Sequence, residues 1–394
     1  MKLGMNSMAK VTQDVEESRD IQEMHISQEV ASPQVEGRAC GKLYLTGEYA
    51  VVDGAGAVIS AVNKEINGRI ISASDSERSD AISVAWGADA LSNMRVPAFA
   101  THNELRYVKA ASYVASRYLY EDAILVSHND CIALDSQLVE NDGRKFGLGS
   151  SGAVTVATIQ TMIHAYGNAR TNVSRETVYK LSVLALLIVG DNGSFGDVAC
   201  SSFGQMVYYI RPSQEFSQQL IARIEKTSIH DVVNLPWDQL EITALTWPHD
   251  ILAFIGWTGT PASSYDLVNA VHAYKTDCAQ QYQEFVESSA RISHDMKDAC
   301  EHGNAQDFVD AYHRASELIS LFSRETGDFA ETKQLREFKE IARKYGCEAK
   351  FSGAGGGDCG IAIARKSQVH SDAIEKMIDE WKKSGIEIMP WELR

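Results

Sequence analysis

The sequence contains no apolar run of about 18 residues, which is the length that a membrane-spanning helix needs. Its densest apolar stretch, residues 181–189, is too short and predicts a buried helix instead. Residues 1–34 are polar and acidic and show no secretory signal. We therefore expect no membrane partner.

Cysteine patterns that indicate a disulfide framework or a zinc site are also lacking. The seven cysteines are odd in number, scattered along the chain, and form no CxxC pair. This usage favours reduced thiols and a cytoplasmic location.

Positive charge is scarce, with 37 Lys and Arg residues against 53 Asp and Glu residues and a net charge of -16 at pH 7. Such an excess of negative charge argues against nucleic acid or an anionic membrane as a partner. A protein of this composition that handles phosphate must concentrate its positive charge locally.

The remaining composition is that of a globular protein, with 44% hydrophobic and 23% charged residues among 394. That length favours one large domain or two closely packed lobes with room for a substrate cleft. Residues 1–37, by contrast, lack a sustained apolar period and are predicted to form a flexible extension.

Beyond residue 38 the hydrophobic pattern predicts an α+β fold, rich in strands first and in helices later. Short runs broken by glycine predict strands at residues 40–46, 57–62, 68–72, 123–126, 131–134, 251–255 and 360–364. Longer periodic runs predict helices at residues 104–120, 153–166, 174–189, 263–289, 290–303, 304–322, 332–345 and 370–384.

The segment most informative about chemistry is KFGLGSSGA at residues 145–153, where a glycine-rich loop becomes a helix. Glycines allow the backbone to fold closely around a ligand. The free N–H groups and the dipole of a helix N-terminus favour an anion, and a triphosphate fits that geometry. The spacing is not that of a P-loop, because no lysine follows the last glycine. A plain glycine turn with a serine N-cap is the structural alternative.

Three further segments accompany this loop. CGKLYLTGEYAV at residues 40–51 reads as a strand that enters a tight turn, GDNGSFGDVA at 190–199 as a polar glycine loop, and SGAGGGDCG at 352–360 as a glycine-rich turn. Taken alone, Lys42 is typical of a solvated surface charge, and Asp197 or Asp358 of a local turn hydrogen bond. Four glycines in five residues nevertheless cost much chain entropy on folding, which argues against a simple linker.

Together, the four segments resemble the GHMP kinase family, whose three motifs occur here in the same order over about nine-tenths of the chain. The resemblance implies an N-terminal lobe of the ribosomal-protein-S5-like kind at residues 38–240 and a ferredoxin-like C-terminal lobe at 241–394. The active site is then expected between the two lobes.

The resemblance also implies roles for individual residues. Lys42 and Asp197 match catalytic residues, and Ser151 matches the serine that approaches Mg2+. ATP is expected to bind at Lys145, Gly147, Leu148, Gly149, Ser150, Ser151, Gly152 and Ala153. The substrate is expected at Lys42, Tyr44, Ser150, Asp197, Gly353, Ala354, Gly355 and Gly356. One position departs from the family pattern: Leu186 stands where mevalonate kinases carry a glutamate metal ligand, and Asp191 is nearby but out of register.

Within the family, the segments are most similar to the bacterial phosphomevalonate kinase branch, which implies phosphomevalonate as the acceptor. A mevalonate kinase or another GHMP small-molecule kinase is the alternative enzyme, and a non-catalytic GHMP-fold protein that binds metabolites is the alternative class. Either a monomer or a weak homodimer is expected.

Overall fold

The computed structural model describes residues 36–73, 81–99, 105–140, 142–168, 173–260, 264–328 and 330–394. Apart from residues 36 and 37, the extension predicted at residues 1–37 lies outside this part of the chain. Among the described residues, no helix combines the length and apolar character needed to cross a lipid bilayer. The seven cysteines all belong to the described part and are free thiols.

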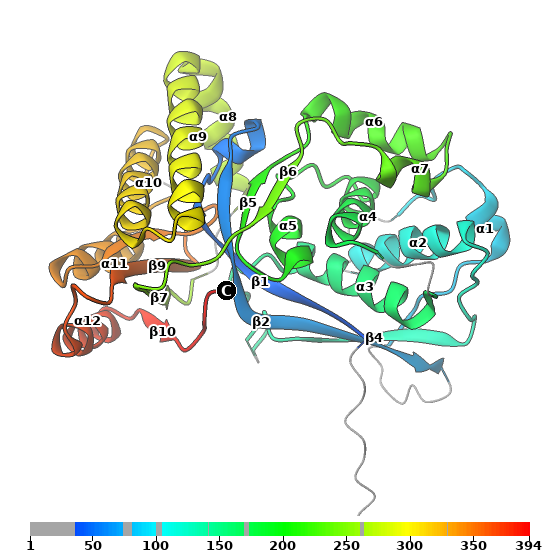
Figure 1. The fold of residues 1–394 in the computed structure, drawn as a ribbon, viewed down its shortest axis with the longest axis horizontal. Coiled ribbons are helices and arrows are strands. Elements are labelled where there is room, and N and C mark those ends of the chain that lie inside the picture. The colour runs from blue at the N-terminus through cyan, green and yellow to red at the C-terminus, as the bar shows by residue number, and fades with distance from the viewer. Residues whose placement is uncertain are drawn as a thin grey trace, which may run out of the picture. The chain divides into compact units, whose positions relative to one another are not determined.

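The N-terminal lobe is built on an antiparallel sheet of six strands (Figure 1). Five strands follow the order β3-β4-β2-β5-β6, and the sixth strand, β1, also pairs with β2. Strand β2 runs without interruption through both strands expected at residues 57–62 and 68–72. The strands are β1 (Gly37–Thr46), β2 (Ala57–Ser72), β3 (Ile82–Ser83), β4 (Asp130–Ser136), β5 (Val207–Ile210) and β6 (Glu241–Ala244).

Helices cover one face of this sheet in two layers. Helices α3 and α5 contact β1 and β2 directly, and α2 and α4 pack against α3 (Figure 1). Helix α4 begins at a serine N-cap, because the Ser174 hydroxyl accepts a hydrogen bond from the Thr177 N–H at 3.0 Å. The helices of this lobe are the short 3-10 turn η1 (Ala50–Asp53), α1 (Ala88–Ser92), α2 (Arg106–Glu121), α3 (Ser150–Tyr166), α4 (Arg175–Ile188), α5 (Gly196–Phe203), α6 (Gln214–Ile224) and α7 (Ile229–Asn234).

The C-terminal lobe is built on a four-stranded antiparallel sheet in the order β10-β7-β9-β8. Numbered along the chain within this lobe, that order is 4-1-3-2, which is the ferredoxin-like arrangement. Its elements are β7 (Ile251–Trp257), α8 (Ser264–Asp277), α9 (Ala279–Glu301), α10 (Ala305–Glu325), α11 (Lys333–Lys344), β8 (Glu348–Phe351), β9 (Cys359–Arg365), α12 (Ser371–Lys383) and β10 (Glu387–Met389). The predicted α+β fold, with two lobes each built on an antiparallel sheet, is confirmed.

The two faces of the C-terminal sheet belong to different hydrophobic clusters, because neighbouring residues of a strand point to opposite faces. Ala362 shares a cluster with Phe338 of α11 and Trp381 of α12, whose rings stack with centroids 4.7 Å apart. Ile361, the next residue back, belongs to the main core, and its carbonyl accepts a hydrogen bond from the Tyr312 hydroxyl of α10 at 2.8 Å. Helices thus cover both faces of this sheet.

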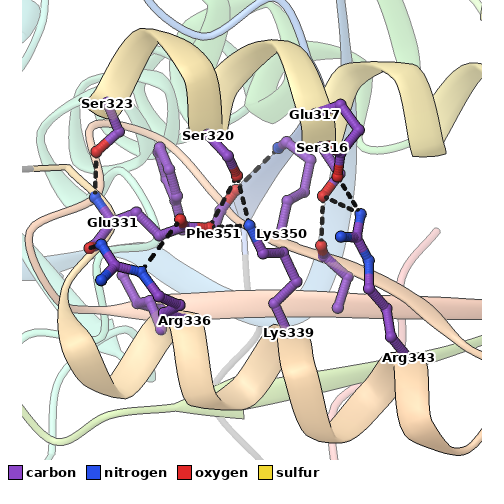
Figure 2. A network of polar contacts seen from close by, with 12 residues as sticks. Ser316, Glu317, Ser320, Ser323, Glu331, Arg336, Lys339, Arg343, Lys350 and Phe351 are labelled. Carbon is purple, nitrogen blue, oxygen red and sulfur yellow. Dashed lines mark hydrogen bonds and ion pairs between the residues drawn. The ribbon is translucent and has the colours of Figure 1, made fainter. Parts of the chain in front are cut away.

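A buried polar network joins α10 to α11 (Figure 2). The Lys339 Nζ lies 2.6 Å from Glu331 Oε1 and donates a hydrogen bond to the Ser320 hydroxyl at 2.6 Å. The Ser320 hydroxyl donates in turn to Glu331 Oε1 at 2.9 Å, and the Ser323 hydroxyl accepts from the Glu331 N–H at 2.8 Å. Each buried charge is paired with an opposite charge and with hydrogen bonds, and these interactions offset the free-energy cost of burying it.

A buried salt bridge and the end of the chain are among the contacts that tie the lobes together. Lys350 of β8 and Glu48, in the turn after β1, form a fully buried salt bridge. The chain end also returns to the first sheet: the Arg394 N–H donates to the Ala61 carbonyl at 2.7 Å, and Leu393 pairs with Val62 of β2.

Two predictions of secondary structure are wrong. Residues 123–126 are not a strand, because Ala123 has φ 59° and the N–H groups of Ala123 and Ile124 close the C-terminus of α2 on Tyr120 and Leu119. The helices expected at 263–289 and 290–303 divide elsewhere, at Cys278, whose φ of -129° interrupts the helical backbone. Helix α9 then runs unbroken across residues 289 and 290.

Candidate active site

The glycine-rich loop lies where β1 meets the start of α3. The Lys42 N–H donates to the Leu148 carbonyl at 3.0 Å, which fixes the loop to β1. Gly149 has φ 77° and is the N-cap of α3, a left-handed conformation that strains any residue with a Cβ. A Cβ there would also lie 2.9 Å from Lys42 Cε. The glycine is therefore required both by the turn and by the lysine beside it.

Lys42 is buried in β1, with 8% of its surface exposed, and its side chain reaches the point where the two lobes meet. Its Nζ lies 5.1 Å from the centroid of the Tyr44 ring. A Cβ on Gly353, in the glycine turn of the C-terminal lobe, would lie 3.8 Å from the same Nζ. The lysine predicted from the first motif is thus not a solvated surface charge.

Asp197 is the second residue of α5 and is buried against the glycine loop. A Cβ on Gly152 would lie 2.6 Å from its Oδ2, which explains the last glycine of the loop motif. Burial raises the pKa of Asp197, the positive charge of Lys42 opposes that shift, and the negative charge of Asp191 adds to it. Lys42 and Asp197, both in the described part of the chain, are neighbours but form no direct salt bridge.

Tyr44 connects Lys42 to the loop that precedes Asp197. Its hydroxyl and the Ser194 hydroxyl are 3.0 Å apart, and its N–H donates to the Ser352 hydroxyl at 2.7 Å. The Tyr209 hydroxyl donates to the Ser194 carbonyl at 2.7 Å. Burial, with the nearby charge of Asp197, raises the pKa of Tyr44 far above its usual range, so the phenol stays protonated. Tyr44 therefore stays neutral, and its hydrogen bonds hold it in place beneath Lys42.

The glycine turn of the C-terminal lobe is fixed by the segment that follows β7 and lies against the glycine-rich loop of the other lobe. The Asp358 N–H donates to the Thr260 carbonyl at 2.9 Å, and its carbonyl accepts from the Thr258 N–H at 3.0 Å. A Cβ on Gly147 would lie 2.4 Å from Asp358 Cγ, so the two glycine-rich segments meet at this point.

These segments enclose a cavity of about 850 Å³. Nine of the residues predicted for the site line it: Lys42, Tyr44, Gly147, Gly149, Ser150, Ser151, Asp197, Gly353 and Ala354. The hydroxyl-bearing residues Ser150 and Ser151 begin α3, so the N-terminus of this helix faces the cavity. The structure thereby brings together residues that lie more than 300 positions apart in the chain.

The other predicted site residues do not line the cavity. Leu148 and Ala153 are buried in the core, and Gly152 faces Asp197. Gly355 and Gly356 pack against the backbone of residue 330. Lys145 is exposed outside the cavity, and its neighbour Arg144 lies over the Trp257 ring at 4.8 Å and donates to the Gly259 carbonyl at 3.3 Å. Arg144 therefore links the two lobes, a contact that the sequence did not indicate.

Several lining residues were not predicted for the site. Arg106 and Tyr107 reach the cavity from the start of α2, Tyr49 from the turn after β1, and Glu48 from beside its partner Lys350. No glycine motif directly precedes Arg106 in the sequence, and it was therefore not among the predicted site residues. Leu186 also lines the cavity.

Comparisons with known proteins agree with this arrangement. The family model described as "GHMP kinases N terminal domain" matches residues 107–205, and that described as "GHMP kinases C terminal" matches residues 296–386. A protein named phosphomevalonate kinase from Streptomyces sp. (strain CL190) is 32% identical over 365 residues, which cover 89% of this chain and 95% of the relative. The chain belongs to the GHMP kinase family. As a GHMP kinase, it is an ATP-dependent phosphotransferase.

Two further relatives of this GHMP kinase are informative. The solved structure of Streptococcus pneumoniae phosphomevalonate kinase in complex with phosphomevalonate and AMPPNP superposes with a TM-score of 0.71 at 26% identity, covering 91% of this chain and 99% of that chain. A mevalonate kinase from Thermococcus gammatolerans is 26% identical over 89% of this chain and 97% of the relative.

Proposed function

We propose that this GHMP kinase is a phosphomevalonate kinase, which transfers the γ-phosphate of ATP to 5-phosphomevalonate and releases 5-diphosphomevalonate and ADP. The observation that carries the proposal is the 32% identity to a protein of that name over nearly the whole chain. The cavity between the lobes, which Lys42 lines, is compatible with that chemistry.

The nature of the acceptor sets what the cavity must do. A phosphomonoester has a second pKa near 6, so its oxygen is largely ionised at neutral pH and needs no strong base. The difficulty is the approach of one anion to another, so that positioning and charge neutralisation dominate. In this proposal Lys42 neutralises the transferring phosphate, and Asp197 holds Lys42 in place. ATP lies on the loop from Gly147 to Ser151, and phosphomevalonate lies toward Tyr44 and the turn at Gly353.

Magnesium is part of the proposal, because ATP is used with this ion in phosphotransferases. Magnesium prefers oxygen ligands and commonly takes one or two carboxylates together with substrate phosphates. The described residues contain no group of three His, Cys, Asp or Glu side chains suited to a metal, and Leu186 provides no ligand. The Ser151 hydroxyl and the Asp191 carboxylate, which line the same cavity, fit an ion that is bound chiefly through ATP. When bound, it would neutralise phosphate charge.

Mevalonate kinase is the second candidate, because a protein of that name is also similar over most of the chain. An alcohol acceptor must lose a proton, so that reaction depends more strongly on a basic carboxylate. The raised pKa of Asp197 is compatible with such a base, and only substrate turnover separates the two enzymes.

An assay of ADP release with mevalonate, phosphomevalonate, homoserine and galactose tests the proposal. We expect turnover with phosphomevalonate alone. Preference for mevalonate would establish the alternative enzyme, and no turnover with any of the four would favour a metabolite-binding protein.

For its setting, we propose a cytoplasmic monomer or weak homodimer without a nucleic-acid or membrane partner, in keeping with the net charge of -16 and the free thiols. The division into lobes at residues 240 and 241 remains a prediction, although β6, which begins at Glu241, pairs with β5 of the first sheet.

A further inference from the structure

Carboxylates outnumber cations among the described side chains that line the cavity. The side chains that line it include four carboxylates and two cations: Glu48, Asp191, Asp197 and Asp358, with Lys42 and Arg106. Lys350 neutralises Glu48 from behind, and Lys42 lies beside Asp197. Because both proposed reactants are highly anionic, an acidic cavity opposes their entry unless further positive charge meets them.

Arg106 is the second cation among the described residues that line the cavity. Within the described part of the chain its guanidinium forms no salt bridge, and its hydrogen bond goes from Nη2 to the Tyr107 hydroxyl at 2.8 Å. The guanidinium carbon also lies 4.4 Å from the centroid of the Tyr107 ring. A guanidinium has five N–H donors, so most of its donors are available to a ligand.

The surroundings of Arg106 favour an anion as that ligand. Arg106 is the first residue of α2, and the N-cap residue Leu105 provides no side-chain acceptor. The first turn contains no acidic residue either. Helix α2 packs beside α3, whose first residues Ser150 and Ser151 line the same cavity. The starts of two neighbouring helices and one arginine thus contribute positive potential to one region of the cavity.

We propose that Arg106 is a second phosphate-binding cation of this active site, which binds a phosphate group of ATP or the 5-phosphate of phosphomevalonate; the inference rests on the proposed function. Its planar guanidinium matches phosphate oxygens with two parallel hydrogen bonds, which an ammonium cannot do. Tyr107 orients the guanidinium through the hydroxyl contact and the ring beneath it. Lys42 and Arg106 therefore divide the neutralisation of the reactants between the centre of the cavity and the start of α2.

The test compares Arg106→Gln with Lys109→Gln, which removes the same charge from an exposed position one turn along α2, outside the cavity. Binding of AMPPNP and of phosphomevalonate is measured by calorimetry. Loss of hydrogen bonds to a charged group weakens binding by roughly 10- to 100-fold, and we expect this loss for one of the two ligands in Arg106→Gln. Lys109→Gln is expected to stay within about twofold of the wild type. The ligand that weakens identifies the source of the phosphate.

Phosphate-free ligands make the test specific. Adenosine and mevalonate, measured as competitive inhibitors, are expected to bind Arg106→Gln as they bind the wild type. Equal weakening of ligands with and without phosphate would mean that Arg106 only supports packing, which overturns the proposal. Unchanged binding of both AMPPNP and phosphomevalonate would overturn it as well.

Two further variants keep the test decisive. Arg106→Lys retains the charge without the paired donors, so a loss of about three- to tenfold is expected for the same ligand even if Arg106→Gln does not fold. Tyr107→Phe is expected to cause a smaller loss of the same kind, because it removes only the orienting hydroxyl. If the wild type does not turn over phosphomevalonate, the proposed function fails, whereas the AMPPNP measurements still decide the role of Arg106.

Discussion

Replacing Gly152 with alanine is expected to damage catalysis while leaving the fold intact. The glycine is the third residue of α3, and an added Cβ would lie 2.6 Å from Asp197 Oδ2. Since ordinary contact begins at 3.4 Å, the carboxylate must move by about 0.8 Å, the difference of these two distances. The obstructing atom is the end of a side chain, so Asp197 can shift without moving the backbone of α5.

We therefore expect a small effect of this substitution on stability and a large effect on turnover. Alanine favours a helix interior over glycine by up to about 1 kcal/mol, which offsets part of the crowding. A misplacement near 1 Å in an active site can reduce the rate by about 100-fold, or roughly 2.7 kcal/mol of barrier. We expect Gly152→Ala to lose 10- to 100-fold in kcat, on the order of that misplacement cost, with a small change in melting temperature.

The measurement is kcat with saturating ATP and phosphomevalonate, and the melting temperature, on the same preparation. Gly87→Ala is the matched control, because Gly87 has φ -62° and a Cβ added there would meet no neighbouring atom within 4 Å. A near-normal kcat in Gly152→Ala would refute the reasoning that the position of Asp197 matters. A large fall in melting temperature would show instead that the contact is too rigid to relax.

Four other perturbations follow from the same site and core. If the acceptor is a phosphate, Lys42→Met should reduce turnover by about 10²- to 10³-fold and more than Asp197→Asn does, because charge neutralisation dominates; the reverse order would favour an alcohol acceptor. Burial raises the pKa of Asp197, so its ionised form lowers the stability of the folded state at neutral pH. We therefore expect Asp197→Asn to raise the melting temperature at pH 7. The increase should become smaller as the pH falls toward the ordinary pKa of a carboxyl group. Ser151→Ala should lower turnover far more than stability, whereas loss of a simple N-cap would cost about 1 kcal/mol of stability and leave turnover normal. Glu331→Gln leaves Lys339 buried without its counter-charge, so urea titration should show a loss of about 3–5 kcal/mol, and a loss below 1 kcal/mol would contradict the view that this pair is fully desolvated.

The parts of the site that the sequence predicted are those that depend on local backbone chemistry. A glycine-rich loop before a helix can be recognised in the sequence, because only glycine tolerates the φ of 77° at Gly149 and the close approach of Asp197 to Gly152. Lys42 was different: its burial follows from β1 packing against the loop, and only the family resemblance distinguished it from a surface lysine.

The remaining parts depend on contacts that no local pattern encodes. Glu48 and Lys350 are separated by 302 positions, and neither residue type by itself indicates a buried partner. Arg106 enters the cavity because α2 packs on α3, which is a tertiary outcome. The strand expected at residues 123–126 failed for a related reason, since apolar residues there close the end of a helix rather than extend a sheet.

The return of the last residues to β2 has a consequence for how the protein is made and handled. Ala61 exchanges backbone hydrogen bonds with Arg394 at 2.7 and 3.1 Å, so a strand formed early in synthesis stays incomplete until residues 392–394 have been added. Contacts of such large sequence separation slow folding and leave a sheet edge exposed in the meantime. An affinity tag fused directly after Arg394 would begin beside Ala61 of β2, within the first sheet.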